Sequence, residues 1–473
     1  MVFTSATFLF YFLPIVLIGS FVIKKEYVNY FLLLMSIIFF SWNQINYLYI
    51  IVLNILITYL TTIFIEKYEN DKKFFLVAGL TLIIIILIYF KYIDFIIDII
   101  NFSIGTKFDA LNIILPIGIS FFTFQSISYI IDVYRKETAA EKNILYLSSY
   151  IMLFPQLIAG PIVRYVDIKD KLLDRNVTID KFEYGIKRFV VGLSKKVIIA
   201  NVLGEIVDRI FADSATTYSP IIMIICIVSY MYQIYYDFSG YSDMAIGMGH
   251  MLGFTYKENF NYPYKSKSIT EFWRRWHISL SSFFRDYVYI PLGGKYKHVY
   301  LNLLIVFLLT GIWHGASINF VIWGLWNAIF IILERIITHS MDENTLYKLN
   351  KNIFIKILKS IYTYIVILIG WVWFRCYDFD SAILFFKKLL AMMKPEHQVY
   401  SALWYLDNFV IFILVLAFVF SFGYHKKLIK IIKSHISAYQ YQFLSNILHI
   451  ILFLISIMFI YQDSYNPFIY FQF

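Results

Sequence analysis

Residues 299–333 read VYLNLLIVFLLTGIWHGASINFVIWGLWNAIFIIL and contain no Asp, Glu, Lys or Arg. As one straight α-helix this stretch would be roughly 50 Å long, well beyond the ~30 Å hydrocarbon core of a bilayer. We therefore expect a break, which Gly311 and Gly315 mark, with His314 at the break. An ionisable side chain at such depth is costly in lipid and usually faces an interior cavity. His314 is thus the first candidate functional residue; a neutral imidazole hydrogen-bonded between helices is the alternative.

Apolar runs of this kind recur along the whole chain. Of its 473 residues, 60% are hydrophobic and 15% are charged, against roughly 25% charged residues in soluble domains. Many runs reach the about 18 residues that a membrane-crossing helix needs. The sequence predicts an all-α, polytopic membrane protein with about eleven transmembrane or re-entrant helices. We expect one membrane domain, residues 1–473.

The basic residues predict the orientation of the chain. The net charge is +10, but the Lys and Arg side chains lie between apolar segments, where they contact lipid headgroups rather than nucleic acid. Three early basic loops are placed in the cytoplasm by the positive-inside rule: Lys24–Lys25, Lys67–Lys73 and Arg135–Lys142. Two apolar segments separate each loop from the next. The N-terminus is therefore expected outside.

The apolar stretch 143–163 is expected to be broken or re-entrant. It contains Pro155 and the pair Gly160-Pro161, and basic residues flank it on both sides. A single crossing cannot begin and end on the same side of the membrane. Irregular backbone at that depth is tolerated only where protein or a watery cavity covers it, so this stretch hints at a pocket within the membrane.

A second candidate block runs from Glu271 to Leu280 and mixes two arginines, two tryptophans and one histidine: Trp273, Arg274, Arg275, Trp276 and His277. One reading is an interfacial amphipathic helix, with Trp at headgroup depth and Arg on lipid phosphates. The other reading is functional, with the arginines neutralising the phosphates of an entering donor and His277 close to the site.

A third block lies in the apolar stretch 219–254, whose only charged residues are Asp237 and Asp243. Buried carboxylates require Arg or Lys partners, so a structural role is favoured over a catalytic one. Cys226 and Cys376 are 150 positions apart, without the close spacing of a metal or redox site. We interpret both cysteines as packing residues, and we expect no metal site.

The chemistry that remains is acyl transfer or passive carriage. The chain has no Gly-x-Ser-x-Gly elbow, Walker loop or His-Glu-x-x-His pair, which removes the common hydrolase, nucleotide-driven and zinc interpretations. A histidine beside a hydroxyl can act as general base in attack on an ester or thioester carbonyl. A secondary transporter is the alternative from another class, but it predicts inverted repeats, and none is visible. A scaffold subunit of a polymer-secretion complex would tolerate replacement of His314.

Six blocks resemble the membrane-bound O-acyltransferase family, most closely its bacterial branch that includes the alginate O-acetylation membrane protein and relatives acting on cell-wall polymers. The blocks span nearly the whole chain, and those around the two histidines are the specific ones. They are Met1–Ser5, Leu115–Phe122, Asp237–Asp243, Trp273–Ser279, Thr310–Gly315 and Ile469–Phe473.

The resemblance implies a ring of tilted helices around a central tunnel in the bacterial plasma membrane. It implies His314 as catalytic base and His277 as the second catalytic polar residue. Donor and substrate contacts are expected from the neighbouring aromatic and charged residues: Trp273, Arg274, Arg275, Trp276, Trp313, Asp237 and Asp243.

The same resemblance implies the substrates and partners. An acyl group, expected to be acetyl, comes from a cytoplasmic donor such as acetyl-CoA or a related thioester, and no resident cofactor is expected. It crosses the membrane to an SGNH-type extracytoplasmic acetyltransferase, which esterifies a polysaccharide or cell-wall polymer. Within the family, D-alanyl transfer to teichoic acid from an acyl-carrier protein is the alternative.

Overall fold

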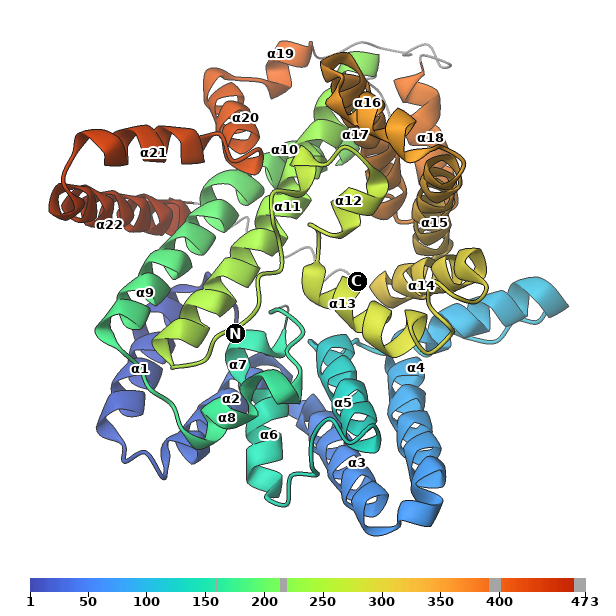
Figure 1. Ribbon diagram of the computed structural model, residues 1–473, viewed down its shortest axis with the longest axis vertical. Coiled ribbons are helices and arrows are strands. Elements are labelled where there is room, and N and C mark those ends of the chain that lie inside the picture. The colour runs from blue at the N-terminus through green and yellow to red at the C-terminus, as the bar shows by residue number, and fades with distance from the viewer. Residues whose placement is uncertain (159, 213–218, 391–400, 463–473) are drawn as a thin grey trace. The chain divides into compact units, whose positions relative to one another are not determined.

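The computed structural model describes residues 1–158, 160–212, 219–390 and 401–462. All regular secondary structure in these ranges is helical (Figure 1). The closing block Ile469–Phe473 lies outside the described residues.

Six of the described helical segments are long and apolar enough to cross a membrane. A further pair, α20 and α21, passes the same test together but is bent by 75° at a short break. Three shorter apolar helices also occur, at Phe8–Val22, Val28–Trp42 and Val299–His314. The six long segments are Ile45–Lys67, Glu69–Ile104, Pro220–Met251, Ile318–His339, Ile353–Arg375 and Ala438–Gln462. The chain is therefore an all-α, multi-pass membrane protein, as the sequence predicts; the count of about eleven and the ring around a tunnel stay predictions.

The described chain packs as two compact units. Unit 1 comprises Met1–Val190 and Tyr241–Glu258, and unit 2 comprises Val191–Gly240 and the chain from Asn259 onward. Helices α9 (Ile179–Ser194) and α11 (Pro220–Met251) contribute residues to both units.

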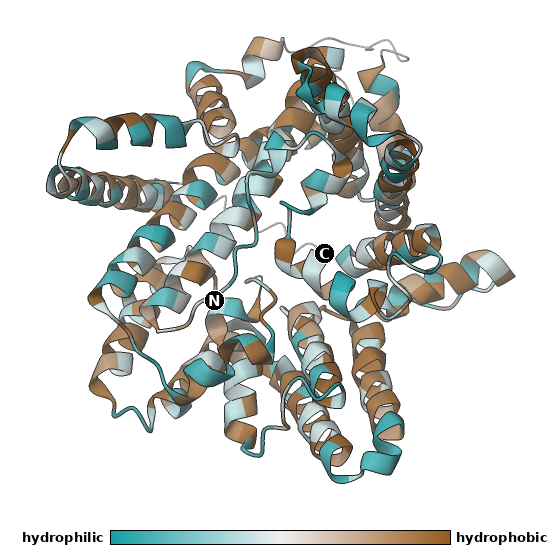
Figure 2. Ribbon diagram, viewed as in Figure 1, coloured by the Kyte–Doolittle hydropathy of each residue, from teal (hydrophilic) through white to brown (hydrophobic). Residues whose placement is uncertain are grey.

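Unit 1 is built on long apolar helices joined by basic turns. Helices α3, α4 and α5 pack against one another (Figure 1), and Gly79 of α4 leaves room for Thr61 of α3. The turn between α3 and α4 is hydrophilic (Figure 2), as the basic loop Lys67–Lys73 requires. The helices are α1 (Leu13–Val22), α2 (Val28–Gln44), α3 (Leu48–Lys67), α4 (Lys72–Ile104), α5 (Ile119–Tyr134), α6 (Ile144–Met152), α7 (Phe154–Leu157) and α8 (Tyr165–Leu173).

The stretch 143–163 is broken, as predicted. It forms the two short helices α6 and α7, which meet at the non-helical Leu153, and the next described helix, α8, begins at Tyr165. The break is held by hydrogen bonds within unit 1: the backbone N–H of Phe154 donates to Ser36 Oγ at 3.1 Å, and Gln156 Nε2 donates to the Tyr150 carbonyl at 2.5 Å. These bonds satisfy polar groups that a helix would otherwise pair internally.

Unit 2 carries both candidate histidines. Its helices, beyond the shared parts of α9 and α11, are α10 (Asn201–Ala212), α12 (Ile269–Trp273), α13 (Ile278–Phe284), α14 (Val299–His314), α15 (Ile318–His339), α16 (Glu343–Lys351), α17 (Ile353–Arg375), α18 (Phe379–Leu389), α19 (Ala402–Tyr405), α20 (Asn408–Ser421), α21 (His425–His435) and α22 (Ala438–Gln462).

The stretch 299–333 forms the predicted pair of helices, α14 and α15, which lie side by side (Figure 1). The chain breaks after His314, where Gly315 is fully extended. The expectation that both glycines mark the break is wrong for Gly311, which lies inside α14. A side chain at Gly311 would meet the Phe320 carbonyl oxygen at 2.3 Å, and Gly324 faces it from α15. The small residue therefore serves close helix packing, which is common between membrane helices.

Candidate active site

His314 is the last residue of α14 and is 4% exposed. Its ring lies against aromatic side chains of two other helices, with centroid distances of 5.0 Å to Trp323 of α15 and 4.9 Å to Phe374 of α17. Asn319 of α15 ties these helix ends together, because its side-chain amide donates to the carbonyls of Cys376 at 2.8 Å and Asp378 at 2.7 Å. His314 thus lies in an aromatic enclosure at one end of the α14–α15 hairpin.

His277 is fully buried and caps the N-terminus of α13 in a left-handed backbone conformation, with φ of 44°. Such a conformation costs a non-glycine residue about 1–3 kcal/mol and persists only where its surroundings fix it. The fixing contact is Asn259, whose carbonyl accepts the N–H of Ile278 at 3.0 Å. The strain lies at one of the two histidines that the sequence singles out.

Asn259 also determines the tautomer of His277. Its Oδ1 atom accepts the backbone N–H of Ser279 at 3.1 Å and the Ser279 hydroxyl at 2.9 Å. A backbone N–H can only donate, so the contacted atom must be the amide oxygen. That oxygen lies 3.2 Å from His277 Nδ1, which must therefore carry the hydrogen. Nε2 is then an acceptor nitrogen. His277 lies in the turn between α12 and α13, outside the membrane-spanning helices. Burial lowers the pKa of its ring to about 3, so the ring is neutral near pH 7.

Trp313 brings the two histidines into one cluster. Its ring centroid lies 4.6 Å from that of His314 and 5.8 Å from that of His277. The ring of Phe238 also packs edge-on against His277, at 4.6 Å. The two histidines therefore share one indole as a neighbour.

The block from Glu271 to Leu280 is not one interfacial amphipathic helix. It forms two short helices, α12 and α13, separated by Arg274–His277. Both tryptophans are buried within the protein rather than exposed to lipid: Trp273 is 7% exposed and Trp276 is 2% exposed. The one-helix reading fails because His277 is in a left-handed conformation that interrupts the helix. Glu334 of α15 accepts the first N–H groups of α12 and holds this short helix within unit 2.

The two tryptophans of this block extend the aromatic enclosure. Trp273 donates from Nε1 to Asn327 Oδ1 at 3.0 Å, and its ring lies 5.5 Å from Trp323, a neighbour of His314. Trp276 stacks on Phe272 at 5.5 Å. Both side chains thus belong to the aromatic packing around the site.

The two arginines of the block differ in their surroundings. Arg275 forms an ion pair with Glu271 at 2.8 Å and donates to the Asn261 carbonyl at 3.2 Å, so it braces the turn. Arg274 is exposed and lines a cavity of about 470 Å³ together with Trp273 and Arg285. The lining of this cavity also includes apolar side chains, among them Phe307 of α14. Of the two arginines, Arg274 is the one placed to meet a ligand.

Asp237 and Asp243 each have the basic partner that the sequence requires. In unit 2, Asp237 lies 2.6 Å from Lys196 Nζ, and both side chains are almost fully buried. In unit 1, Asp243 pairs with Arg188 at 2.6 Å, and Arg188 also contacts Glu258. Both aspartates join neighbouring helices, which favours the structural interpretation.

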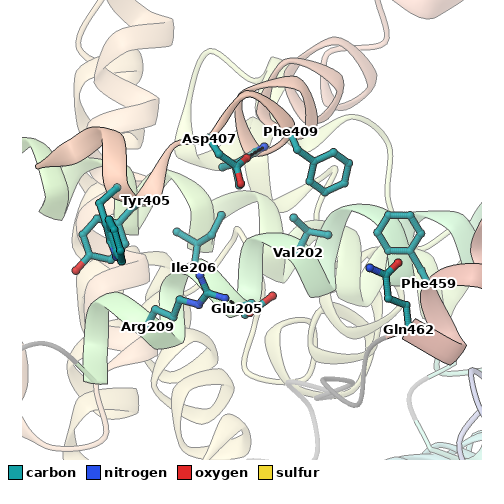
Figure 3. A pocket seen from close by; sticks show the side chains of 11 residues that line it. Val202, Glu205, Ile206, Arg209, Tyr405, Asp407, Phe409, Phe459 and Gln462 are labelled. Carbon is teal, nitrogen blue, oxygen red and sulfur yellow. Dashed lines mark hydrogen bonds and ion pairs between the residues drawn. The ribbon is translucent and has the colours of Figure 1, made fainter. Parts of the chain in front are cut away.

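Unit 2 has another cavity, of about 410 Å³, between α10, α20 and α22. Figure 3 shows Glu205 and Arg209 of α10 at this cavity, with Asp407 and Phe409 from the start of α20. Glu205 and Arg209 form an ion pair with each other. No motif or spacing in the sequence indicates these residues.

Sequence reasoning also missed Asn259, Trp323 and Phe374. Asn259 lies in a polar stretch with another asparagine two residues later, and only its buried carboxamide distinguishes it. Trp323 and Phe374 belong to apolar helices in which nothing in the sequence indicates the face that meets His314. Their aromatic character was the one available signal.

The sequence model of MBOAT, the membrane-bound O-acyltransferase family, matches residues 135–379, a range that contains both histidines. The chain is also 41% identical over 392 residues to the "Probable alginate O-acetylase AlgI" of Azotobacter vinelandii, covering 81% of this chain and 76% of that protein. The chain belongs to the membrane-bound O-acyltransferase family. This membership confirms the resemblance, makes the chain an acyltransferase and sets the transporter alternative aside.

The chain is also similar to two proteins that acylate other polymers, according to their names. The "Peptidoglycan O-acetyltransferase" of Helicobacter pylori is 34% identical over 429 residues, covering 83% of this chain and 80% of that protein. The "Teichoic acid D-alanyltransferase" of Bacillus subtilis is 31% identical over 239 residues, covering 46% of this chain and 59% of that protein. The likeness to the O-acetylating relatives thus extends over more of the chain.

Proposed function

We propose that the chain takes an acetyl group from a cytoplasmic thioester donor and delivers it across the membrane for O-acetylation of an extracytoplasmic polysaccharide or cell-wall polymer. The observation that carries this proposal is the pair of histidines joined by Trp313 within an aromatic enclosure, in a chain whose long-matching relatives are named for O-acetylation.

In the proposed reaction His314 is the general base. A hydroxyl oxygen attacks the thioester carbonyl, a C–O bond forms and the C–S bond breaks. His314 takes the hydroxyl proton and returns it to the leaving thiolate. The aromatic rings around His314 limit the entry of water, so the thioester is protected from hydrolysis. His277, neutral and with an acceptor at Nε2, orients the attacking hydroxyl.

The donor end of the site is the cavity lined by Arg274 and Arg285. A CoA-type or carrier-bound thioester brings phosphate groups, and guanidinium groups bind phosphate with charge-assisted hydrogen bonds. Trp273 forms part of the cavity wall and leads through Trp323 to His314. The acyl group would pass along this row of rings.

The partners follow from the same proposal. The chain works in the bacterial plasma membrane as one membrane domain with its N-terminus outside. It hands the acetyl group to an SGNH-type extracytoplasmic acetyltransferase. No resident cofactor is needed for this chemistry.

The test is to replace His314 with Ala and to measure ester-linked acetate on the envelope polymer. We expect the acetate to fall to background while the protein remains in the membrane. The control is His449→Ala, because His449 lies on α22 and its ring bonds to the Ser445 carbonyl of the same helix at 2.6 Å. Unchanged acetate in His314→Ala cells would refute the proposal.

D-alanyl transfer to teichoic acid is the second candidate, favoured by the Bacillus subtilis relative. Mass spectrometry of the ester released from the polymer separates the two candidates. D-alanine in place of acetate, together with dependence on an acyl-carrier protein, would establish the second.

A further inference from the structure

Helix α21 runs at a sharp angle to α20, the apolar helix before it. It spans His425–His435 and is bent by 75° from α20. The turn between them uses Gly423 in a left-handed conformation, with φ of 71°, which a residue with a side chain rarely adopts. None of the α21 side chains is buried. The helix therefore lies on the outside of unit 2, joined to α22 in a hairpin (Figure 1).

The two faces of α21 are chemically opposite. At 100° per residue the lysines gather on one side and the aliphatic residues on the other, and Figure 2 shows the resulting alternation of hydrophilic and hydrophobic residues. The basic face consists of Lys426, Lys427, Lys430 and Lys433, and the apolar face consists of Leu428, Ile429, Ile431 and Ile432.

No acidic residue close in the sequence offsets the positive charge of α21. From residue 408 to residue 462 the chain contains no Asp or Glu. An exposed amphipathic helix with this distribution is complementary to anionic lipid headgroups, with its apolar face in the acyl boundary. We propose that α21 lies in the plane of the membrane surface, binds anionic phospholipid headgroups and thereby holds the segment that positions His277.

The contact that couples α21 to the site is Tyr262. Lys426 Nζ lies 4.4 Å from the centre of the Tyr262 ring, and the His425 ring lies 6.0 Å from it. Tyr262 itself is held in a left-handed conformation with φ of 48°. The first two residues of α21 therefore contact the turn at Tyr262, whose backbone conformation is restricted.

Tyr262 is three positions after Asn259, the hydrogen-bond partner of His277. The N–H of Asn261 donates to the Arg275 carbonyl at 2.9 Å, and the carbonyl of Asn259 accepts the Ile278 N–H at 3.0 Å. The segment 259–262 is thus bonded along its length to the turn that contains His277. Headgroup binding by α21 stabilises this segment through Tyr262.

The test uses hydrogen–deuterium exchange on the full chain in nanodiscs of phosphatidylcholine alone or mixed with phosphatidylglycerol. Each lysine near an anionic surface raises the affinity of a segment for it by about fivefold. We therefore expect amides of α21, and of residues 259–278, to exchange at least about fivefold more slowly in the anionic discs. A variant with the four lysines changed to Gln should lose this difference, and a variant with all four changed to Arg should keep it.

Four results would overturn the inference. The first is equal exchange of α21 in both lipids, and the second is a lipid effect that survives in the Gln variant. The third is protection of α21 by a soluble acidic carrier protein in neutral discs that exceeds the protection by phosphatidylglycerol, which would assign the helix to a protein partner. Protection of α21 without protection of residues 259–278 would overturn the coupling to His277. None of these readouts depends on acetyl transfer.

Discussion

At the scale of single residues, one carboxamide contacts both the ring of His277 and the first turn of the helix that follows it. Asn259 accepts from His277 Nδ1 and from two groups of Ser279. We predict that Asn259→Ala lowers acetyl transfer by about 10- to 100-fold, because a displaced catalytic group loses much of its advantage. The rate of ester formation in membranes, normalised to protein amount, measures this.

Asn261→Ala is the matched control for Asn259→Ala. Asn261 is exposed and contributes its backbone N–H and carbonyl to the turn, so its side chain should be dispensable. An equal loss of acetyl transfer in the two variants would contradict a specific role of the Asn259 carboxamide.

A second prediction at this scale concerns pH. Burial lowers the pKa of His277 to about 3, against about 6.5 in an unfolded chain. Between these values the unfolded chain binds one proton more than the folded chain, so the free energy of unfolding falls as the pH drops below about 6.5. His277→Gln removes this titration, and thermal unfolding in detergent between pH 7 and pH 4.5 should then depend less on pH. An unchanged pH dependence would count against a buried neutral ring.

At the scale of elements, the α14–α15 hairpin depends on a close approach at Gly311. A methyl group there would lie 2.3 Å from the Phe320 carbonyl oxygen. We predict that Gly311→Ala destabilises the folded chain by about 1–3 kcal/mol through overpacking. The midpoint of thermal aggregation of the detergent-solubilised protein reports the change.

Gly370→Ala provides the control for this variant. Gly370 also lies within a helix of unit 2, but a methyl group there meets Trp326 at an ordinary 3.4 Å. Alanine favours helix over glycine by about 1 kcal/mol, so this variant should be neutral or slightly more stable. A loss of stability as large as that of Gly311→Ala would point to glycine in general rather than to the close approach.

The same scale separates what the sequence could predict from what it could not. Apolar length predicted the break after His314, because a straight helix over 299–333 is too long for a bilayer. Helix-breaking residues and basic residues on both flanks predicted the break within 143–163. The turn at Arg274–His277 was not predictable, because its left-handed residue is a histidine rather than a glycine. The partners of His314, Trp323 and Phe374, come from separate helices, and a uniformly apolar helix does not reveal which face packs inward.

At the scale of the whole molecule, the distribution of charge predicts the side of the membrane on which each loop lies. Tyr296 is 85% exposed between two lysines, and Tyr377 is 89% exposed beside an acidic stretch. With both native cysteines changed to Ala, we predict that a membrane-impermeant maleimide labels Tyr377→Cys in intact cells. Tyr296→Cys should be labelled only after permeabilisation, because basic loops stay in the cytoplasm. The reverse pattern would invert the proposed route of the acetyl group.

The glycine contact between α14 and α15 also bears on how the protein is made. His314 is at the tip of a hairpin whose arms are apolar and meet through Gly311 and Gly324. If the arms left the ribosome-bound translocon one at a time, the imidazole would face lipid before Trp323 and Phe374 had arrived to cover it. If α14 and α15 associate early, they enter the bilayer together and His314 is already covered by Trp323. We therefore expect residues that hold this hairpin together to govern membrane insertion during synthesis as well as the stability of the finished protein.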